Sequence, residues 1–249
     1  MTSIARGRLR PLLGLTLAAL LGMLVPLGLG TWQLERRVWK LDLIAARAAG
    51  LAAAPIPLPE RIADPAALEF HRVWVEGRFR HDLELHLIGR FYRDQPGYQI
   101  VTPLILADGS AVLVNRGFVP LGAEDPARRP AGQVVGVVRV EGVVRQSVAP
   151  GWLTQDNQPA NNVWFYPDVV HMAQAAGLSR VHEVFIEAGP APNPGGLPIG
   201  GQSQIDLPND HLQYAITWYS LAVALAVIYG ILCHRQLSGD RSPWMPTKS

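Results

Sequence analysis

The sequence predicts an α+β membrane protein in which two transmembrane helices flank a β-rich, mainly antiparallel outer domain. Two long apolar stretches, residues 12–29 and 211–233, contain no Asp, Glu, Lys or Arg. Each is long enough to cross the hydrocarbon core, which takes about 20 apolar residues in a helix. Between them lie nearly all the charged residues and several segments with the apolar-polar alternation of half-buried strands. The predicted order is a tail (1–11), a helix, the outer domain (30–210), a helix and a tail (234–249).

Basic residues near the second stretch predict the orientation. The first stretch has basic residues on both sides and does not determine the orientation. Asp206 and Asp210 precede the second stretch, whereas Arg235, Arg241 and Lys248 follow it. Because basic flanks stay in the cytoplasm, both termini are expected there, with the outer domain in the periplasm. The protein is expected to be multi-pass in the cell inner membrane, or in the mitochondrial inner membrane of a eukaryote.

A cleaved signal peptide is the alternative interpretation of residues 1–30. Its apolar run of 18 residues is long for the hydrophobic region of a signal peptide, and the small residues around Gly28 and Gly30 form only a weak cleavage site. We therefore predict a retained anchor.

Charge and cysteine content exclude several functions. The domain of residues 30–210 has 16 Lys and Arg against 19 Asp and Glu, so nothing favours binding to nucleic acid. The only cysteine is Cys233, inside the second apolar stretch. A domain without cysteine has no disulfide framework, no thiol exchange and no thiolate copper or zinc site.

The outer domain reads as one helix followed by strands. Leu34, Val38 and Leu41 recur at helical spacing, which predicts that the first helix continues through residues 31–54 until a proline-rich run ends it. Strands are predicted over residues 71–80, 83–92, 98–106, 111–119, 134–144 and 184–187.

Three other segments complete this prediction. Asp108-Gly109 joins two of the strands as a hairpin turn. One further helix is predicted over residues 166–176, and a Pro- and Gly-rich linker, residues 189–204, leads to the second span.

Catalytic and metal motifs are missing from the sequence. No GxSxG, HExxH or phosphate-binding loop occurs, and most of the seven histidines have no partner at ligand spacing. An enzyme is therefore not expected.

His211 is the exception among the histidines because it opens the second span. At helical spacing it shares a stripe with Tyr214, Ala215, Trp218 and Ala222. Trp and Tyr commonly line membrane interfaces, and a histidine there can simply stay hydrated. An ionisable group at the mouth of a span is nevertheless a candidate functional site, and imidazole is a common ligand of haem iron.

Short blocks along the chain resemble those of one protein family. The blocks are Gly30-Thr31-Trp32-Gln33 with Arg36, Arg37, Trp39 and Lys40, PGY at 96–98, VTP at 101–103, VNRGFVP at 114–120, PGG at 194–196, PIGGQ at 198–202, and Asn209, His211, Leu212, Gln213, Tyr214, Thr217, Trp218 and Tyr219. By these blocks, in this order and within a two-span topology, the chain resembles the Surfeit locus 1 family of cytochrome c oxidase assembly proteins over nearly its whole length.

The resemblance implies a role in maturing the haem a-containing large subunit of the terminal oxidase. It implies haem a as transient cargo and His211 as the iron ligand. The helical stripe adds Tyr214 and Trp218 as residues that would pack beside the ring. The implied partners are the large oxidase subunit, the haem a synthesis machinery and the lipid bilayer. The alternative is a non-haem scaffold that stabilises the unfinished large subunit. The resemblance assigns no role to Arg36, Arg37, Lys40, Asn115 or Arg116.

Overall fold

The computed structural model describes residues 3–203 and 208–238. Asp206, Arg241 and Lys248, on which part of the predicted orientation depends, lie outside these residues, as does most of the predicted C-terminal tail. The chain forms two compact units, one of Met1–Ala45 with Asp206–Ser249 and one of Ala46–Ile205.

The described elements follow one another in the order that the sequence predicts, with several short additions. In chain order they are α1 (Ser3–Ala52), β1 (Ile56–Pro57), α2 (Pro65–Leu68), β2 (Arg72–Phe79), η1 (His81–Leu83), β3 (Leu85–Tyr92), β4 (Gln95–Ile105), β5 (Ala111–Pro120), η2 (Pro126–Arg128), η3 (Pro130–Gly132), β6 (Val138–Gln146), η4 (Pro159–Asn161), β7 (Val163–Trp164), α3 (Val169–Ala175), β8 (Val181–Ala188), η5 (Pro194–Gly196) and α4 (His211–Ser238).

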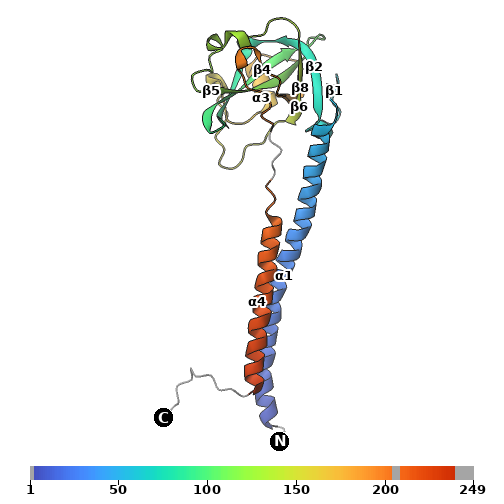
Figure 1. Ribbon diagram of the computed structural model, residues 1–249, viewed down its shortest axis with the longest axis vertical. Helices are drawn as coiled ribbons and strands as arrows, with labels where there is room; N and C mark the ends of the chain where they lie inside the picture. Colours follow the sequence, from blue (N-terminus) through green and yellow to red (C-terminus); the bar gives the residue numbers. More distant parts are fainter. Residues whose placement is uncertain (1–2, 204–207, 239–249) are drawn as a thin grey trace. The chain divides into compact units, whose positions relative to one another are not determined.

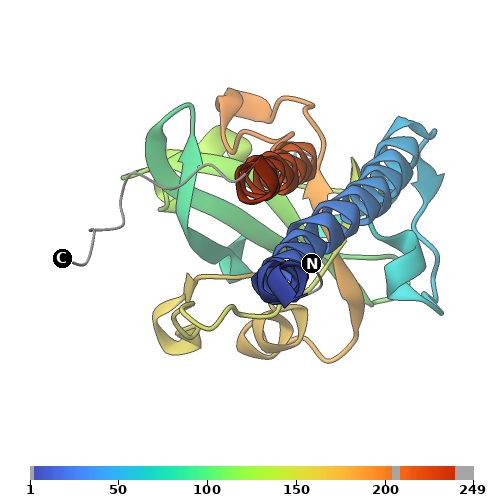
Figure 2. The same cartoon turned by 90° about the horizontal axis from the view of Figure 1, so that it is seen from below.

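The helical unit is an antiparallel pair of α1 and α4 (Figures 1 and 2). The Thr16 and Tyr229 hydroxyls lie 2.7 Å apart, and those of Thr31 and Tyr219 lie 3.1 Å apart. Residues later in α1 therefore contact residues earlier in α4. The N-terminal end of α1 lies beside the C-terminal end of α4. Both helices are long and apolar enough to cross a membrane by length and composition.

Helix α1 continues without interruption beyond the apolar stretch to Ala52, as predicted. The tyrosine ring of Tyr219 packs on Gly30, where a Cβ atom would come within 2.9 Å of that ring. A small residue at this point lets the two helices approach closely.

The second unit is built around a closed β-barrel (Figure 1). The strands follow the order β2-β6-β8-β5-β4, and β4 pairs again with β2 through Leu104 and Ile105, which closes the ring. Five of the eight strand pairings are antiparallel, and the pairs β1–β2, β3–β7 and β5–β8 are parallel. The α+β fold class with a mainly antiparallel sheet is therefore confirmed.

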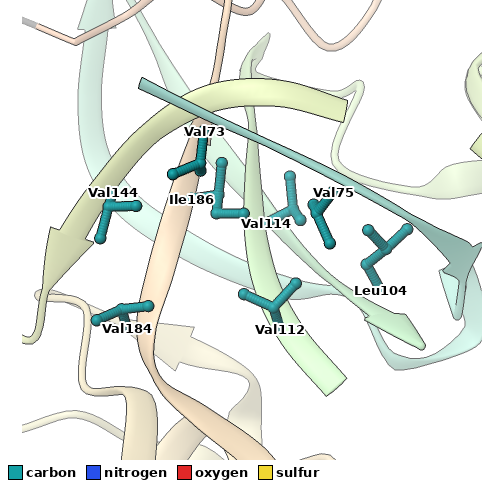
Figure 3. Packing of buried hydrophobic residues seen from close by; sticks show 8 residues of the cluster. All are labelled: Val73, Val75, Leu104, Val112, Val114, Val144, Val184 and Ile186. Carbon is teal, nitrogen blue, oxygen red and sulfur yellow. The ribbon is translucent and has the colours of Figure 1, made fainter. Parts of the chain in front are cut away.

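The barrel interior is filled by alternate residues of the ring strands. Figure 3 shows them pointing toward one another, and all are at most 6% exposed: Val73, Val75, Leu104, Val112, Val114, Val144, Val184 and Ile186. Because successive side chains of a strand point to opposite faces, their neighbours Leu113 and Phe185 point outward. These form a second cluster with Trp164 and with Met172 of α3.

Two predicted elements begin later than expected, and one predicted turn has a different conformation. The strand predicted over residues 134–144 begins at Val138, because the chain bends at Gly136, which has a φ of +94°. The helix predicted over residues 166–176 starts at Val169, because the Asp168 side chain accepts a hydrogen bond from the His171 amide and caps it there. In the hairpin turn, Gly109 alone takes a positive φ, and Asp108 instead accepts hydrogen bonds from Ser110.

The turn between β3 and β4 gives a prediction about stability. Arg93 and Asp94 both have positive φ, +48° and +63°, as in a type I′ turn, which favours Asn-Gly. We expect Arg93→Asn with Asp94→Gly to raise the free energy of unfolding by about 1 kcal/mol, because side chains at positive φ are strained. Denaturant unfolding of the full chain measures this, and a lower stability would contradict it.

Candidate functional site

His211 begins α4 and is held by a side chain of α1. Its Nδ1 atom donates a hydrogen bond to Oε1 of Gln33, over a distance of 2.7 Å. The helix starts here because the amide of Tyr214 donates to the carbonyl of Asp210, at 3.2 Å. With the proton on Nδ1, the other ring nitrogen, Nε2, carries the lone pair that a metal ligand needs.

Tyr214 and Trp218, the other two predicted haem-binding residues, differ in how far they are exposed. Ala215 and Ala222 are buried, so they mark the face of α4 that packs within the helical unit. Tyr214 is 56% exposed and Trp218 is half-buried. Tyr214 lies about one helical turn after His211, and Trp218 lies about two turns after it.

On α1, the basic residues after Gln33 lie on the helix surface. The guanidinium of Arg36 stacks over the ring of Trp39, 3.9 Å from its centre. Trp32 and Trp39 are about half exposed. This end of α1 therefore combines aromatic rings with positive charge, a composition typical of a membrane interface.

In the barrel unit, Arg116 belongs to a buried ionic cluster. Its Nη1 atom lies 3.6 Å from Oε1 of Glu84, and Arg129 donates to both carboxylate oxygens of Glu84. All three side chains are at most 2% exposed. His81 completes the cluster, with Nε2 donating to the Val134 carbonyl at 3.0 Å and Nδ1 3.3 Å from Nη1 of Arg116.

The pKa values of this cluster follow from burial and charge. Burial lowers the pKa of Arg116 to about 10, against the opposing effect of Glu84. Burial alone would raise the pKa of Glu84, but hydrogen bonds from His81 and Arg129 and the two guanidinium charges hold that pKa below its ordinary value. One carboxylate therefore compensates two buried arginines.

Arg116 also holds the linker that leads to α4. Its Nη2 atom donates to the Gly132 carbonyl at 2.6 Å and to Oδ1 of Asn193 at 3.1 Å. The amides of Phe118 and Ile199 each donate to the other's carbonyl, at 2.9 and 2.7 Å. The linker is thus bound to β5 at Asn193 and at Ile199, which gives the VNRGFVP and PIGGQ blocks a structural role that their sequences did not reveal.

Asn115 faces the opposite side of β5 from Arg116. Its Nδ2 atom donates to Oε1 of Gln99 at 3.2 Å, and its Oδ1 accepts from the amide of Gly117 at 3.1 Å. It lines a cavity on the outer face of the sheet.

Among the side chains that the structure describes, no group of three or more His, Cys, Asp and Glu residues could hold a metal ion. A single imidazole can supply one bond to a metal ion whose other bonds come from a macrocycle. In His211 the other ring nitrogen is held by Gln33. Gln33 belongs to one of the family-like blocks, but its contact with His211 was not predicted, because no periodic pattern links residues 178 positions apart.

Comparison with known proteins shows the family to which the chain belongs. The model of the SURF1 family matches residues 20–223. The SURF1-like protein of Monosiga brevicollis is 41% identical over 242 residues, which cover 92% of this chain and 90% of that protein. Surfeit locus protein 1 of Homo sapiens is 38% identical over 226 residues, 83% of this chain and 74% of that protein, and that of Mus musculus is 38% identical over 217 residues, 81% and 70%. The chain belongs to the SURF1 family.

Proposed function

We propose that this protein is an assembly factor for cytochrome c oxidase that binds haem a and assists its delivery to the large catalytic subunit. Membership of the SURF1 family supports the assembly role. The partners are then the large oxidase subunit, the haem a synthesis machinery and the lipid bilayer. The protein acts as a carrier and not as an enzyme.

One observation carries the haem part of this proposal: the bond of His211 to Gln33. A hydrogen bond to Nδ1 fixes the tautomer and the orientation of an imidazole, and it raises the basicity of Nε2. Nε2 of His211 would then be the axial ligand of the iron. The amphipathic rings of Tyr214 and Trp218 would provide flat apolar surface at the same end of α4.

The antiparallel pairing of α1 and α4 supports the proposed placement in the membrane. Both chain ends would face the cytoplasm and the β-barrel the periplasm, or the intermembrane space in a mitochondrion. Arg235 in the last turns of α4 is the described part of the basic flank. His211 would then lie at the outer interface of the membrane.

Replacing His211 by alanine tests the ligand role. We expect the wild type, purified from a host that makes haem a, to show a Soret band, and His211→Ala to lose it. The protein should still be inserted, because truncating a half-buried side chain at a helix start leaves no large cavity. Haem content per protein, measured by pyridine haemochrome, is the readout.

Two further variants make this test specific. His234→Ala removes an exposed histidine near the other end of α4 and should keep the full haem content. Gln33→Leu leaves the ligand but removes its partner, and it should weaken haem affinity about tenfold or more. Unchanged haem content in His211→Ala would refute the ligand role, and a haem-free wild type would favour the non-haem scaffold.

A further inference from the structure

The face of α1 that binds His211 carries two cations beyond the start of α4. Gln33 lies on this face, where it accepts the hydrogen bond of His211. Arg37 and Lys40 follow Gln33 at steps of four and three residues, which keeps them on the same face of the helix. Because α4 is antiparallel to α1 and begins at His211, its residues do not cover this pair (Figure 1). We call Arg37 and Lys40 the basic stripe.

The basic stripe has no compensating charge within α1. The residues three and four positions before and after each of its two members include no Asp or Glu. The acidic residues of this stretch, Glu35 and Asp42, are exposed and lie on the opposite face of the helix. Neither Arg37 nor Lys40 forms an ion pair or a hydrogen bond with another residue that the structure describes. Two like charges one turn apart repel each other, so this face of α1 favours an anion beside it.

The neighbouring Arg36 shows the contrast. It is exposed, and its guanidinium stacks over the ring of Trp39, 3.9 Å from the ring centre. Arg37 and Lys40 are half-buried, and neither stacks on a ring among the described aromatic residues. Arg36 is thus engaged by a side chain of its own helix, whereas the cations of the basic stripe are free to bind a ligand.

The place of the basic stripe suits one end of an amphipathic ligand. At 1.5 Å per residue, it lies about 6–10 Å beyond Gln33 along the axis of α1, on the side away from the apolar residues 12–29. A planar molecule held at His211 therefore meets apolar helix surface on one side and two cations on the other. Haem a has the matching asymmetry, because its two propionate carboxylates lie together at one edge of an otherwise largely apolar macrocycle.

We propose that Arg37 and Lys40 bind the two propionates of the haem whose iron is held by His211. The inference rests on the proposed function and deepens it, because it sets the orientation of the ring, with its carboxylate edge toward water. A guanidinium binds a carboxylate through two parallel N–H···O bonds, and an ammonium group binds one as a point charge. Both are positioning residues, since neither would touch the iron.

Titration of the full-length protein in detergent with two forms of the cargo tests the inference. One form is haem a, and the other is its dimethyl ester, which keeps the iron and the macrocycle but has no charge on the propionates. Binding is followed by the Soret band. We expect the wild type to bind haem a about tenfold more tightly than the ester, the factor typical of one charge-assisted hydrogen bond.

Matched variants assign this preference to the basic stripe. Arg37→Gln with Lys40→Gln should lower the affinity for haem a to that for the ester. The affinity for the ester should stay unchanged, which would show that the variant folds and still binds the iron. Arg37→Lys should keep part of the preference. Arg36→Gln removes a cation of the same helical turn that is engaged with Trp39, and it should keep the preference in full.

Three results would overturn the inference. Equal affinities for haem a and its ester in the wild type would assign the basic stripe to lipid head groups instead. A preference that persists in Arg37→Gln with Lys40→Gln would place the propionates elsewhere. An equal loss in Arg36→Gln would make the effect one of overall charge. In each case, loss of haem in His211→Ala would leave the proposed function standing, whereas a wild type that binds neither form would overturn both proposals.

Discussion

Replacing Glu84 by glutamine is expected to lower the free energy of unfolding by about 3–5 kcal/mol, the usual cost of removing one partner from a buried ion pair. The carboxylate of Glu84 compensates both Arg116 and Arg129, and the three side chains are at most 2% exposed. A glutamine fits the same space but leaves two buried guanidinium groups without a counter-charge. Thermal unfolding of the full chain, followed by tryptophan fluorescence, measures the loss.

The pH dependence gives a second measurement of the same cluster. Because the folded-state pKa of Glu84 is held below its ordinary value, its contribution to stability is present above the pKa of the unfolded chain and is lost as the pH falls through the folded-state value. The difference between wild type and Glu84→Gln should therefore shrink below about pH 4.3. Asp82→Asn is the control, because Asp82 is exposed and forms its ion pair with Arg80, which is exposed too. An equal loss in both variants would contradict the prediction.

Replacing Gly117 by alanine is expected to detach the linker from β5. Gly117 has a φ of +116°, and a Cβ atom there would overlap the carbonyl oxygen of Ile199. The strain of a side chain at positive φ costs about 1–2 kcal/mol. Displacing Ile199 would also break its two hydrogen bonds with Phe118, each worth about 1 kcal/mol. We expect faster proteolysis between residues 189 and 203 together with a lower melting temperature.

Gly136→Ala separates the two effects in this prediction. Gly136 has a similar φ of +94°, but a Cβ atom there would meet nothing within 4 Å. This variant should show the cost of backbone strain without release of the linker. If proteolysis in the linker rises equally in both variants, the overlap with Ile199 is not the cause.

The strands of the barrel could be predicted because each carries its own periodic signal. In β2, Val73, Val75 and Gly77 are buried and alternate with side chains that are more exposed. The same period places Val112 and Val114 inside the barrel and Leu113 outside. The alternation does not specify which strand pairs with which. The parallel pairing of β5 with β8 is therefore absent from the sequence prediction.

The parts of the site that the sequence did not reveal are contacts between distant residues. Glu84 and Arg129 are adjacent in space because η1 and the turns after β5 meet, and each alone reads as an ordinary surface charge. The place of His211 at the start of α4 was predictable, but its hydrogen bond to Gln33 was not. The cavity that Asn115 lines likewise depends on residues of five strands, which no local pattern specifies.

The parallel pair β5–β8 also sets the order in which the barrel unit can form during synthesis. Strand β5 can pair with β4 as soon as it is made, but its other edge must wait for β8, which follows after the whole of β6 and α3. Contacts between residues far apart in sequence slow folding, because the loop entropy is lost before the pairing compensates for it. Helix α1 precedes every strand in the chain. One edge of β5 therefore stays unpaired until synthesis has reached Ala188. The barrel can close only after α1 has been made.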